Sequence, residues 1–530
     1  MMEAAGDILV LPFFGQGHLN PCVELCKYLS PYTKSRLILI IPSHLSSSIP
    51  SALHQHHPSI EVLHIEAPPT EAAGNGPDHG HNRDHLNQKL AQGIEVFLSE
   101  RYNNVPSKTR PGCVVMDSMM SWCKNIFIRD NIPIFSFFTS GAVSAAMEHA
   151  AWKADVNNMK PGETRMLTGL PDCVALRYSD TRRRNHRGPH GASESDHRGP
   201  GGRYGFGHRG PGGRHGFGHR EPGQAPGWLE EADDFKALLF NTCQGLECPF
   251  LDYLANQVNK PVFGIGPLLP ETYWLSTETF SRDRDSRSSN RKSNYTEDEV
   301  IQWLDSKPSR SVIYISFGSE VGPTMEEYGQ LADALRESRW AFVWVIQPNS
   351  GKSRPPPLLF GDKPSRPNDE EEGYKPIGLQ EKVGKRGMII MGWAPQLLIL
   401  SHPSTGGFLS HCGWNSSVEA IGRGVPILAW PIRGDQFYIA KLVVDYLKIG
   451  AMVTSGDNSS EMVKKSDILE EIDRLMEDKA AHERAKNVSR MFEAGLPSTS
   501  KASLKDLVQL LTTKVSCHLE TATTEFYLEK

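Results

Sequence analysis

The sequence lacks the features that mark several large classes of protein. No apolar run approaches the roughly 20 residues that a membrane-spanning helix needs. The nine cysteines are scattered and none forms a CxxC pair, which argues against a disulfide framework or a zinc ribbon. The 57 basic and 62 acidic residues leave a formal net charge of −5, so nothing indicates a nucleic-acid partner.

The start of the sequence also lacks the pattern of a secretory signal. The opening residues, MMEAAGDILVLPFF, have no basic segment before the first apolar run, and that run is typical of a strand. The scattered cysteines fit a reducing compartment. We therefore expect a cytoplasmic protein without a transmembrane segment.

The chain is too long for a single core, and its apolar runs fall into two series. At 530 residues, two or more domains are expected. The first series predicts strands at 7–14, 37–41, 61–65, 113–116, 133–137 and 237–240, with a helix at 21–29. The second predicts strands at 311–317, 341–346, 388–391, 407–410, 425–430 and 450–453, with helices at 325–338, 416–422 and 435–447. Continuous apolar strands separated by helices indicate doubly wound α/β domains, and two Rossmann-like domains in tandem explain both series.

Three tracts have compositions unlike a packed core. Residues 181–226 repeat an 11-residue unit, HRGPGGRYGFG at 197–207 and HRGPGGRHGFG at 208–218, which is too glycine-rich to bury a face. We expect this tract to be disordered, and metal binding by its histidines is disfavoured because a flexible chain fixes no ligand geometry. Residues 276–296 and 349–376 are polar or proline-rich and predict a linker and a mobile insertion.

Residues 15–21, GQGHLNP, follow the first strand and open the first helix. A glycine-rich turn at this place normally binds phosphate, but Asn20 replaces the third glycine of the dinucleotide fingerprint. His18 instead stands at the carboxyl end of a parallel strand, where sites of α/β proteins cluster. It can serve as a base kept neutral by the helix dipole, or as a structural histidine.

Two further polar residues follow predicted strands. Asp117 comes directly after the strand at 113–116 and could accept the ring N–H of a histidine, although a helix N-cap is an equal alternative. Ser319 follows the strand at 311–317, next to Gly318, and offers a hydroxyl to an anion. On its own, a glycine and a serine after a strand are weak evidence for an anion-binding site.

The sequence HCGWNSSVE at 411–419 joins a predicted strand to a predicted helix. A diphosphate in this turn would meet free backbone N–H groups, the helix dipole, and the side chains of His411, Asn415 and Ser416. Alternatively, residues 416–419 form a capping box that makes Glu419 structural. Capping leaves six polar or aromatic residues unexplained: Trp393, Gln396, His411, Trp414, Asp435 and Gln436.

Residues 393–436 resemble the 44-residue signature of plant UDP-sugar-dependent glycosyltransferases. The shared pattern is a W-x-P-Q opening, H-x-x-x-G-x-F, HCGWNS, a following glutamate, GVP and a closing D-Q. The resemblance extends to residues 15–21, to Asp117 and to residues 311–319. The repeat tract at 181–226 lies outside the usual pattern.

The resemblance implies a GT-B fold, in which two Rossmann-like domains face each other across a cleft. It assigns residues 1–267 to an acceptor-binding domain carrying the insertion at 181–226, and residues 268–300 to an interdomain linker. Residues 301–495 become the UDP-sugar-binding domain, with the insertion at 349–376. Residues 496–530 form a C-terminal segment whose helix, near 500–513, is expected to return to the first domain.

The resemblance also implies a role for each residue of the donor site. Trp393 would stack on uracil, Gln396 would lie beside the base and ribose, and Glu419 would hold the ribose hydroxyls; Ala394 belongs to the same site. The diphosphate would contact His411, Asn415, Ser416 and Ser319. The sugar would be surrounded by Trp414, Asp435 and Gln436. No metal or other cofactor is expected.

By the same resemblance, His18 is the general base and Asp117 stabilises its imidazolium, which gives an inverting O-glycosyltransferase. Trp414 and the closing Gln436 favour UDP-glucose as the donor, since a closing histidine would suggest UDP-galactose. The acceptor is expected to be a small lipophilic plant metabolite, such as a flavonoid, another phenolic, a terpenoid or a hormone, bound near 119–122 and 138–147. The protein is expected to be a monomer. The alternatives are a catalytically silent nucleotide-sugar-binding or scaffold protein, or an enzyme using another UDP-sugar.

Overall fold

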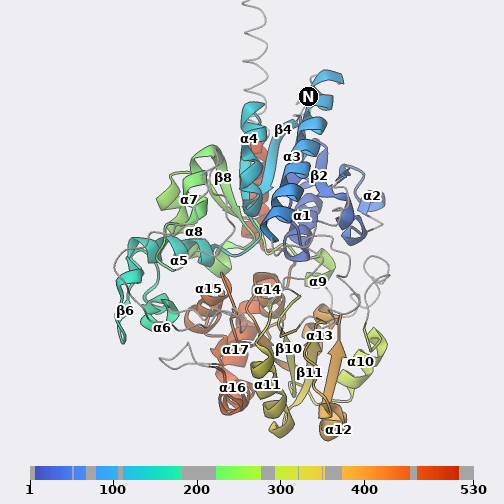
Figure 1. Ribbon diagram of the computed structural model, residues 1–530, viewed down its shortest axis with the longest axis vertical. Coiled ribbons are helices and arrows are strands. Elements are labelled where there is room, and N and C mark those ends of the chain that lie inside the picture. The colour runs from blue at the N-terminus through green and yellow to red at the C-terminus, as the bar shows by residue number, and fades with distance from the viewer. Residues whose placement is uncertain are drawn as a thin grey trace, which may run out of the picture.

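The computed structural model contains two parallel β-sheets, one above the other along the long axis of the molecule, each flanked by helices (Figure 1). It describes residues 6–511 except for 51–52, 67–78, 105–110, 182–221, 276–292, 320, 349, 352–372 and 454–461. Most of the three tracts at 181–226, 276–296 and 349–376 therefore lies outside the described residues. None of the helices that the structure describes is long and apolar enough to cross a membrane.

The first sheet has seven parallel strands in the order β3-β2-β1-β4-β5-β8-β9. Its strands are β1 (Asp7–Leu11), β2 (Leu37–Pro42), β3 (Ile60–Ile65), β4 (Pro111–Asp117), β5 (Ile134–Phe138), β8 (Phe235–Phe240) and β9 (Val262–Gly264). The central strands are buried along nearly their whole length, as their continuous apolar sequences predict.

The second sheet has six parallel strands in the order β12-β11-β10-β13-β14-β15. Its strands are β10 (Val312–Ser316), β11 (Ala341–Ile346), β12 (Gly387–Met391), β13 (Thr405–Ser410), β14 (Ile427–Ala429) and β15 (Gly450–Met452). In both sheets the first three strands run outward in one direction, and the fourth returns to the other side of the first strand, which is the doubly wound arrangement. The α/β fold class predicted from the sequence is confirmed.

The helices connect successive strands, and a small antiparallel pair, β6 (Thr164–Arg165) with β7 (Leu176–Arg177), lies apart from both sheets. The first half contains α1 (Gln16–Leu29), α2 (Leu53–His56), α3 (His79–Asn104), α4 (Lys124–Arg129), α5 (Ala142–Lys153), α6 (Tyr178–Thr181), α7 (Gly227–Glu231), α8 (Gln244–Val258) and α9 (Glu271–Leu275). The second half contains α10 (Glu297–Asp305), α11 (Met325–Glu337), α12 (Leu379–Val383), α13 (Gln396–Ser401), α14 (Trp414–Gly422), α15 (Gln436–Lys441), α16 (Lys465–Glu477) and α17 (Lys479–Ser489).

Two functionally important helices begin earlier than the sequence predicts. Helix α1 begins at Gln16 because Gly15, with φ 109° and ψ 150°, turns the chain sharply out of β1. Pro21 therefore lies inside the helix rather than at its start. Helix α14 begins at Trp414, with Gly413 as its N-cap, so the predicted turn at 411–415 is shorter than expected.

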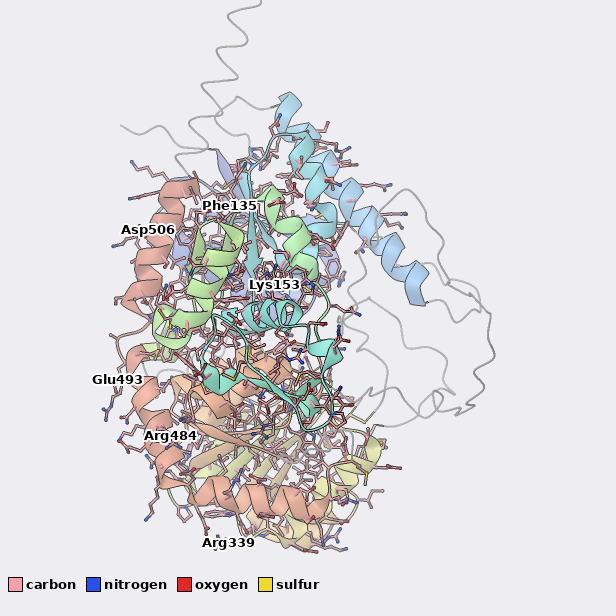
Figure 2. The ribbon with its side chains drawn as sticks, turned by 90° about the vertical axis from the view of Figure 1, so that its left-hand side faces the viewer. Phe135, Lys153, Arg339, Arg484, Glu493 and Asp506 are labelled. Atoms are coloured by element: carbon pink, nitrogen blue, oxygen red, sulfur yellow. The ribbon has the colours of Figure 1, made fainter. Side chains whose placement is uncertain are left out.

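The end of the described chain packs against the first sheet's side of the molecule. Figure 2 shows it running from Arg484 and Glu493 beside the second sheet to Asp506 beside the first. This last segment is helical over residues 498–511, and the Ser500 hydroxyl donates to the Gly266 carbonyl at 2.5 Å. Leu504, Leu507 and Leu511 are fully buried in the core that contains β1 to β9. The helix thus ties the two halves together through apolar burial.

We expect Leu507→Ala to destabilise the protein by about 2–5 kcal/mol, because truncating a fully buried leucine loses apolar burial and leaves a cavity. Urea unfolding measures the loss. Leu510→Ala is the matched control, since Leu510 is only partly buried on the same helix and should cost clearly less. Equal stability of the two variants would contradict the packing of this helix.

Candidate active site in the interdomain cleft

A cavity of about 820 Å³ lies between the two sheets. Its walls come from loops at the carboxyl ends of β1 and β5 on one side and of β10, β12, β13 and β14 on the other. The structure brings the predicted donor-site residues and His18 together around it: His18, Ser319, Trp393, Ala394, Gln396, His411, Trp414, Asn415, Ser416, Glu419, Asp435 and Gln436. Asp117 lies behind His18 rather than in the wall.

His18 is the third residue of α1, and its ring is oriented by two neighbours. Its Nδ1 lies 2.9 Å from Asp117 Oδ2 and 2.9 Å from Thr139 Oγ1. A carboxylate can only accept a hydrogen bond, so Nδ1 carries the proton and Nε2 keeps its lone pair. The His18 side chain is 27 % exposed whereas that of Asp117 is fully buried. The arrangement is therefore suited to a general base at Nε2.

Asp117 fulfils both roles that the sequence left open. Its Oδ1 accepts from the Met119 N–H at 2.9 Å, which caps the short helix Ser118–Cys123, while its Oδ2 faces His18. The bond from the Met119 N–H fixes the orientation of the Asp117 carboxylate. It therefore also fixes the direction in which Asp117 holds the His18 imidazole.

The end of the cavity near Trp393 contains a chain of hydrogen bonds. Tyr314 donates its hydroxyl to Gln396 Oε1 at 3.0 Å, and Gln396 Nε2 donates to Glu419 Oε2 at 2.6 Å and to Ser416 Oγ at 3.0 Å. Ser416 is the third residue of α14 rather than its N-cap, so the alternative of a capping box at 416–419 is wrong. The Glu419 carboxylate is directed to the cavity wall instead.

His411 lies at the N-terminus of α14, between two glycines. A Cβ at Gly413 would come 2.4 Å from His411 Nε2, and one at Gly318 would come 2.9 Å from Cε1, so both positions must lack a side chain. Burial, with a smaller effect of Arg433, lowers the pKa of His411 to about 4. The ring is therefore neutral at pH 7. Its buried Nδ1 has no hydrogen-bond partner among the described residues.

Trp414 and Asn415 reach across the cleft to the first domain. The Trp414 indole is 4 % exposed and donates its N–H to the Asn241 carbonyl at 2.8 Å. Asn415 donates from Nδ2 to the Gly17 carbonyl at 2.8 Å. In an α-helix the Gly17 carbonyl would accept from residue 21, but Pro21 has no N–H, which leaves that carbonyl available.

Asp435 and Gln436 form the wall between β14 and α15. Asp435 Oδ2 accepts from the Ser140 hydroxyl at 3.0 Å, which is another bond between the two domains. Gln436 Oε1 accepts from the backbone N–H groups of Ile432 and Arg433 at 2.9 and 3.0 Å. The Gln436 carbonyl oxygen therefore shapes the loop, which leaves its amide nitrogen as the group suited to a ligand.

Sequence reasoning placed Thr139 and Ser140 only within the segment 138–147 expected to bind the acceptor, and it missed their contacts with His18 and Asp435. Both residues directly follow β5, at the same edge of the sheet where Asp117 ends β4, so the rule that found Asp117 could have found them. Much of the acceptor wall expected at 119–122 and 138–147 is core instead: Met120 and Met147 are fully buried. Across the described residues, no group of three or more His, Cys, Asp or Glu side chains is placed to hold a metal ion.

Glu247 fixes the loop that follows Ser140. Its buried carboxylate accepts from the backbone N–H groups of Ala142 and Val143 at 2.9 and 2.8 Å, at the N-terminus of α5. Burial raises the pKa of Glu247 from its ordinary value of 4.5 to about 7. Gly141, between this carboxylate and the loop, lies under the Trp414 ring, where a Cβ would come 2.5 Å from the indole.

The raised pKa of Glu247 predicts a pH-dependent stability. Between about pH 4.5 and 7 the folded state holds a proton on Glu247 that the unfolded chain has lost. The contribution of this proton to the free energy of unfolding is therefore full below pH 4.5 and disappears as the pH rises through 7. Glu247→Gln does not titrate, so the advantage of the wild type over this variant should shrink by up to about 3 kcal/mol from pH 5 to pH 8. Melting temperatures across this range measure it. The exposed Glu483→Gln should show a constant difference, and a constant difference for Glu247→Gln would refute the assignment.

Sequence comparisons find similar proteins of known family. Residues 288–495 match the sequence model of a family described as "UDP-glucoronosyl and UDP-glucosyl transferase". The chain is 28 % identical to UDP-glycosyltransferase 73C3 of Arabidopsis thaliana, over 95 % of this chain and 96 % of that one. It is 27 % identical to UDP-glucose flavonoid 3-O-glucosyltransferase 7 of Fragaria ananassa, over 84 % and 81 % of the two chains.

A solved structure shares the fold over the whole length. UGT73P12 of Glycyrrhiza uralensis, complexed with glycyrrhetinic acid 3-O-monoglucuronide, superposes with a TM-score of 0.69 at 22 % identity, covering 99 % of each chain. This likeness confirms the predicted GT-B architecture. The family match over residues 288–495 and relatives that align along nearly the entire chain show that this chain is similar to the plant UDP-glycosyltransferases.

Proposed function

We propose that the protein is an inverting O-glucosyltransferase that moves glucose from UDP-glucose to a hydroxyl of a small lipophilic plant metabolite. The observation that carries the proposal is that His18, with its Nδ1 bonded to Asp117, lines the same cavity as the predicted donor residues. A base on one wall and donor-binding groups on the other suit attack from the face opposite the leaving group.

The uridine of the donor is proposed to lie at the Trp393 end of the cavity. Trp393 is half-buried there and offers a flat face to the base, and Ala394 lies beside it. Gln396, held by Tyr314, orients the Glu419 carboxylate toward the cavity. A carboxylate that accepts from two vicinal hydroxyls suits the ribose.

The diphosphate is proposed to lie at the N-terminus of α14. The backbone N–H groups of its first turn point at the cavity and the helix dipole favours negative charge. His411 is neutral at pH 7 and can still donate one N–H, while Ser319 and Ser416 offer hydroxyls. Asn415 would act through its backbone N–H, since its amide bonds Gly17. These donors are expected to stabilise departing UDP without a metal ion.

The proposed reaction is a single displacement. Nε2 of His18 removes the proton of the acceptor hydroxyl, the oxygen bonds to the anomeric carbon, and the bond from that carbon to the UDP oxygen breaks. Asp117 stabilises the imidazolium until solvent removes the proton. Attack opposite UDP converts the α-linked donor into a β-glycoside.

A lipophilic acceptor and a cytoplasmic location are parts of the same proposal. One relative is named as a flavonoid 3-O-glucosyltransferase, and one structural neighbour is complexed with glycyrrhetinic acid 3-O-monoglucuronide. The Phe13 ring, half-buried, packs edge-on to His18 at 5.1 Å and provides an apolar surface beside the base. All eight cysteines of the described residues are free, as in a reducing compartment.

Mass spectrometry of purified protein mixed with several UDP-sugars and a panel of phenolics, terpenoids and hormones tests the proposal. We expect a product heavier by one hexose, formed fastest from UDP-glucose. Faster transfer from another UDP-sugar would overturn the donor assignment. UDP binding without transfer to any acceptor would favour the alternative of a silent nucleotide-sugar-binding protein.

His18→Ala should lower kcat by about 10²–10⁴-fold, because it removes the general base. The Kd for UDP, measured by calorimetry, should stay near that of the wild type, since the proposed UDP contacts come from the second domain. The control is His64→Ala, an exposed histidine on the edge strand β3 that bonds Ser46. A His18→Ala variant with wild-type kcat would eliminate the base assignment.

A further inference from the structure

Two consecutive hydroxyl side chains at the end of β5 contact different halves of the site. Thr139 Oγ1 lies 2.9 Å from Nδ1 of His18, which is the base of the proposed reaction. Ser140 donates its hydroxyl to Asp435 Oδ2 at 3.0 Å, and Asp435 belongs to the other domain. One loop of the first domain therefore touches both the base and the carboxylate proposed to hold the donor sugar.

The Asp435 carboxylate is not used by its own helix. Aspartate at an N-cap position normally accepts a backbone N–H of the first turn, but Asp435 makes no side-chain cap bond to α15. Its backbone carbonyl accepts from the N–H groups of Tyr438 and Ile439 instead. The carboxylate is consequently available to Ser140 and to the cavity that it lines.

The loop that carries Ser140 is held on both sides. Asn241 donates from its backbone N–H to the Ser140 carbonyl at 3.2 Å, and from Nδ2 to the Thr139 carbonyl at 3.2 Å. On the other side, Glu247 binds the next two backbone N–H groups after Gly141. Since the backbone is fixed at both ends, the Ser140 hydroxyl is preorganised and its bond to Asp435 costs little further ordering.

We propose that Ser140 is a positioning residue for donor-sugar recognition, acting through Asp435. By occupying Oδ2, Ser140 fixes the rotation of the carboxylate and leaves Oδ1 directed to the sugar hydroxyls. The inference rests on the proposed function. It adds to the proposed function, because a residue of the first domain then determines how the sugar is held. The proposed UDP contacts, in contrast, all come from the second domain.

Ser140→Ala should therefore weaken recognition of the sugar but not of UDP. We expect kcat/KM for UDP-glucose to fall about tenfold, as for the loss of one hydrogen bond to a charged group. The preference for UDP-glucose over UDP-galactose should narrow, while the Kd for UDP measured by calorimetry should change less than twofold. Ser140→Thr, which keeps the hydroxyl, should retain most of the wild-type preference.

The matched control is Ser136→Ala, the same substitution on β5. The Ser136 hydroxyl is buried and has no hydrogen-bond partner among the described residues, so kcat/KM and donor preference should stay at wild-type values. The double variant Ser140→Ala/Asp435→Ala should lose no more kcat/KM than Asp435→Ala alone, because Ser140 acts only through the Asp435 side chain. Melting temperatures confirm that each variant folds.

Three results would overturn the inference: wild-type donor preference in Ser140→Ala, an equal loss of UDP affinity, or additive losses in the double variant. Calorimetry with UDP-glucose distinguishes a failure of this inference from a failure of the proposed function. A wild type that binds UDP-glucose more tightly than UDP but transfers no sugar contradicts the proposed function alone. In that case Ser140→Ala must still lose the extra affinity that the sugar provides. A wild type that binds no UDP-sugar contradicts both.

Discussion

The candidate active site depends on the first turn of α14 being bonded to the opposite domain. Trp414 donates to the Asn241 carbonyl, and Asn415 donates to the Gly17 carbonyl, so two adjacent residues of the predicted donor motif each bridge the cleft. A helix N-terminus alone would offer an anion site on one domain only. The two bridges place that N-terminus in the same cavity as His18, which lies next to Gly17 on α1.

Pro21 makes one of these bridges possible because proline has no backbone N–H. Its missing N–H deprives the Gly17 carbonyl of its partner within α1, and Asn415 takes that place at 2.8 Å. The other bridge depends on Gly141, which leaves room for the Trp414 ring above Glu247. Small backbone features of the first domain thus help to position the predicted donor motif of the second domain.

Much of this architecture could be predicted from the sequence, whereas the bonds across the cleft could not. The strand β11 has the predicted limits, because a short run of apolar residues rich in β-branched and aromatic side chains favours a buried parallel strand. The prediction places the start of the first helix at Pro21, because proline is favoured at the first helical position, whereas α1 begins at Gln16. The bond from Asn415 to Gly17 joins residues 398 positions apart, and no local pattern encodes such a pair. The roles carried over for the donor residues remain predictions, since they came from resemblance.

In the proposed single displacement, a base on one domain and a leaving group on the other act from opposite faces of the sugar. The anomeric configuration of the product, read from the NMR coupling of its anomeric proton, measures this geometry. Transfer from α-linked UDP-glucose should give only the β-glycoside, since His18 and the N-terminus of α14 share one cavity. An α-glycoside would contradict a single displacement and the placement of the base on which it depends.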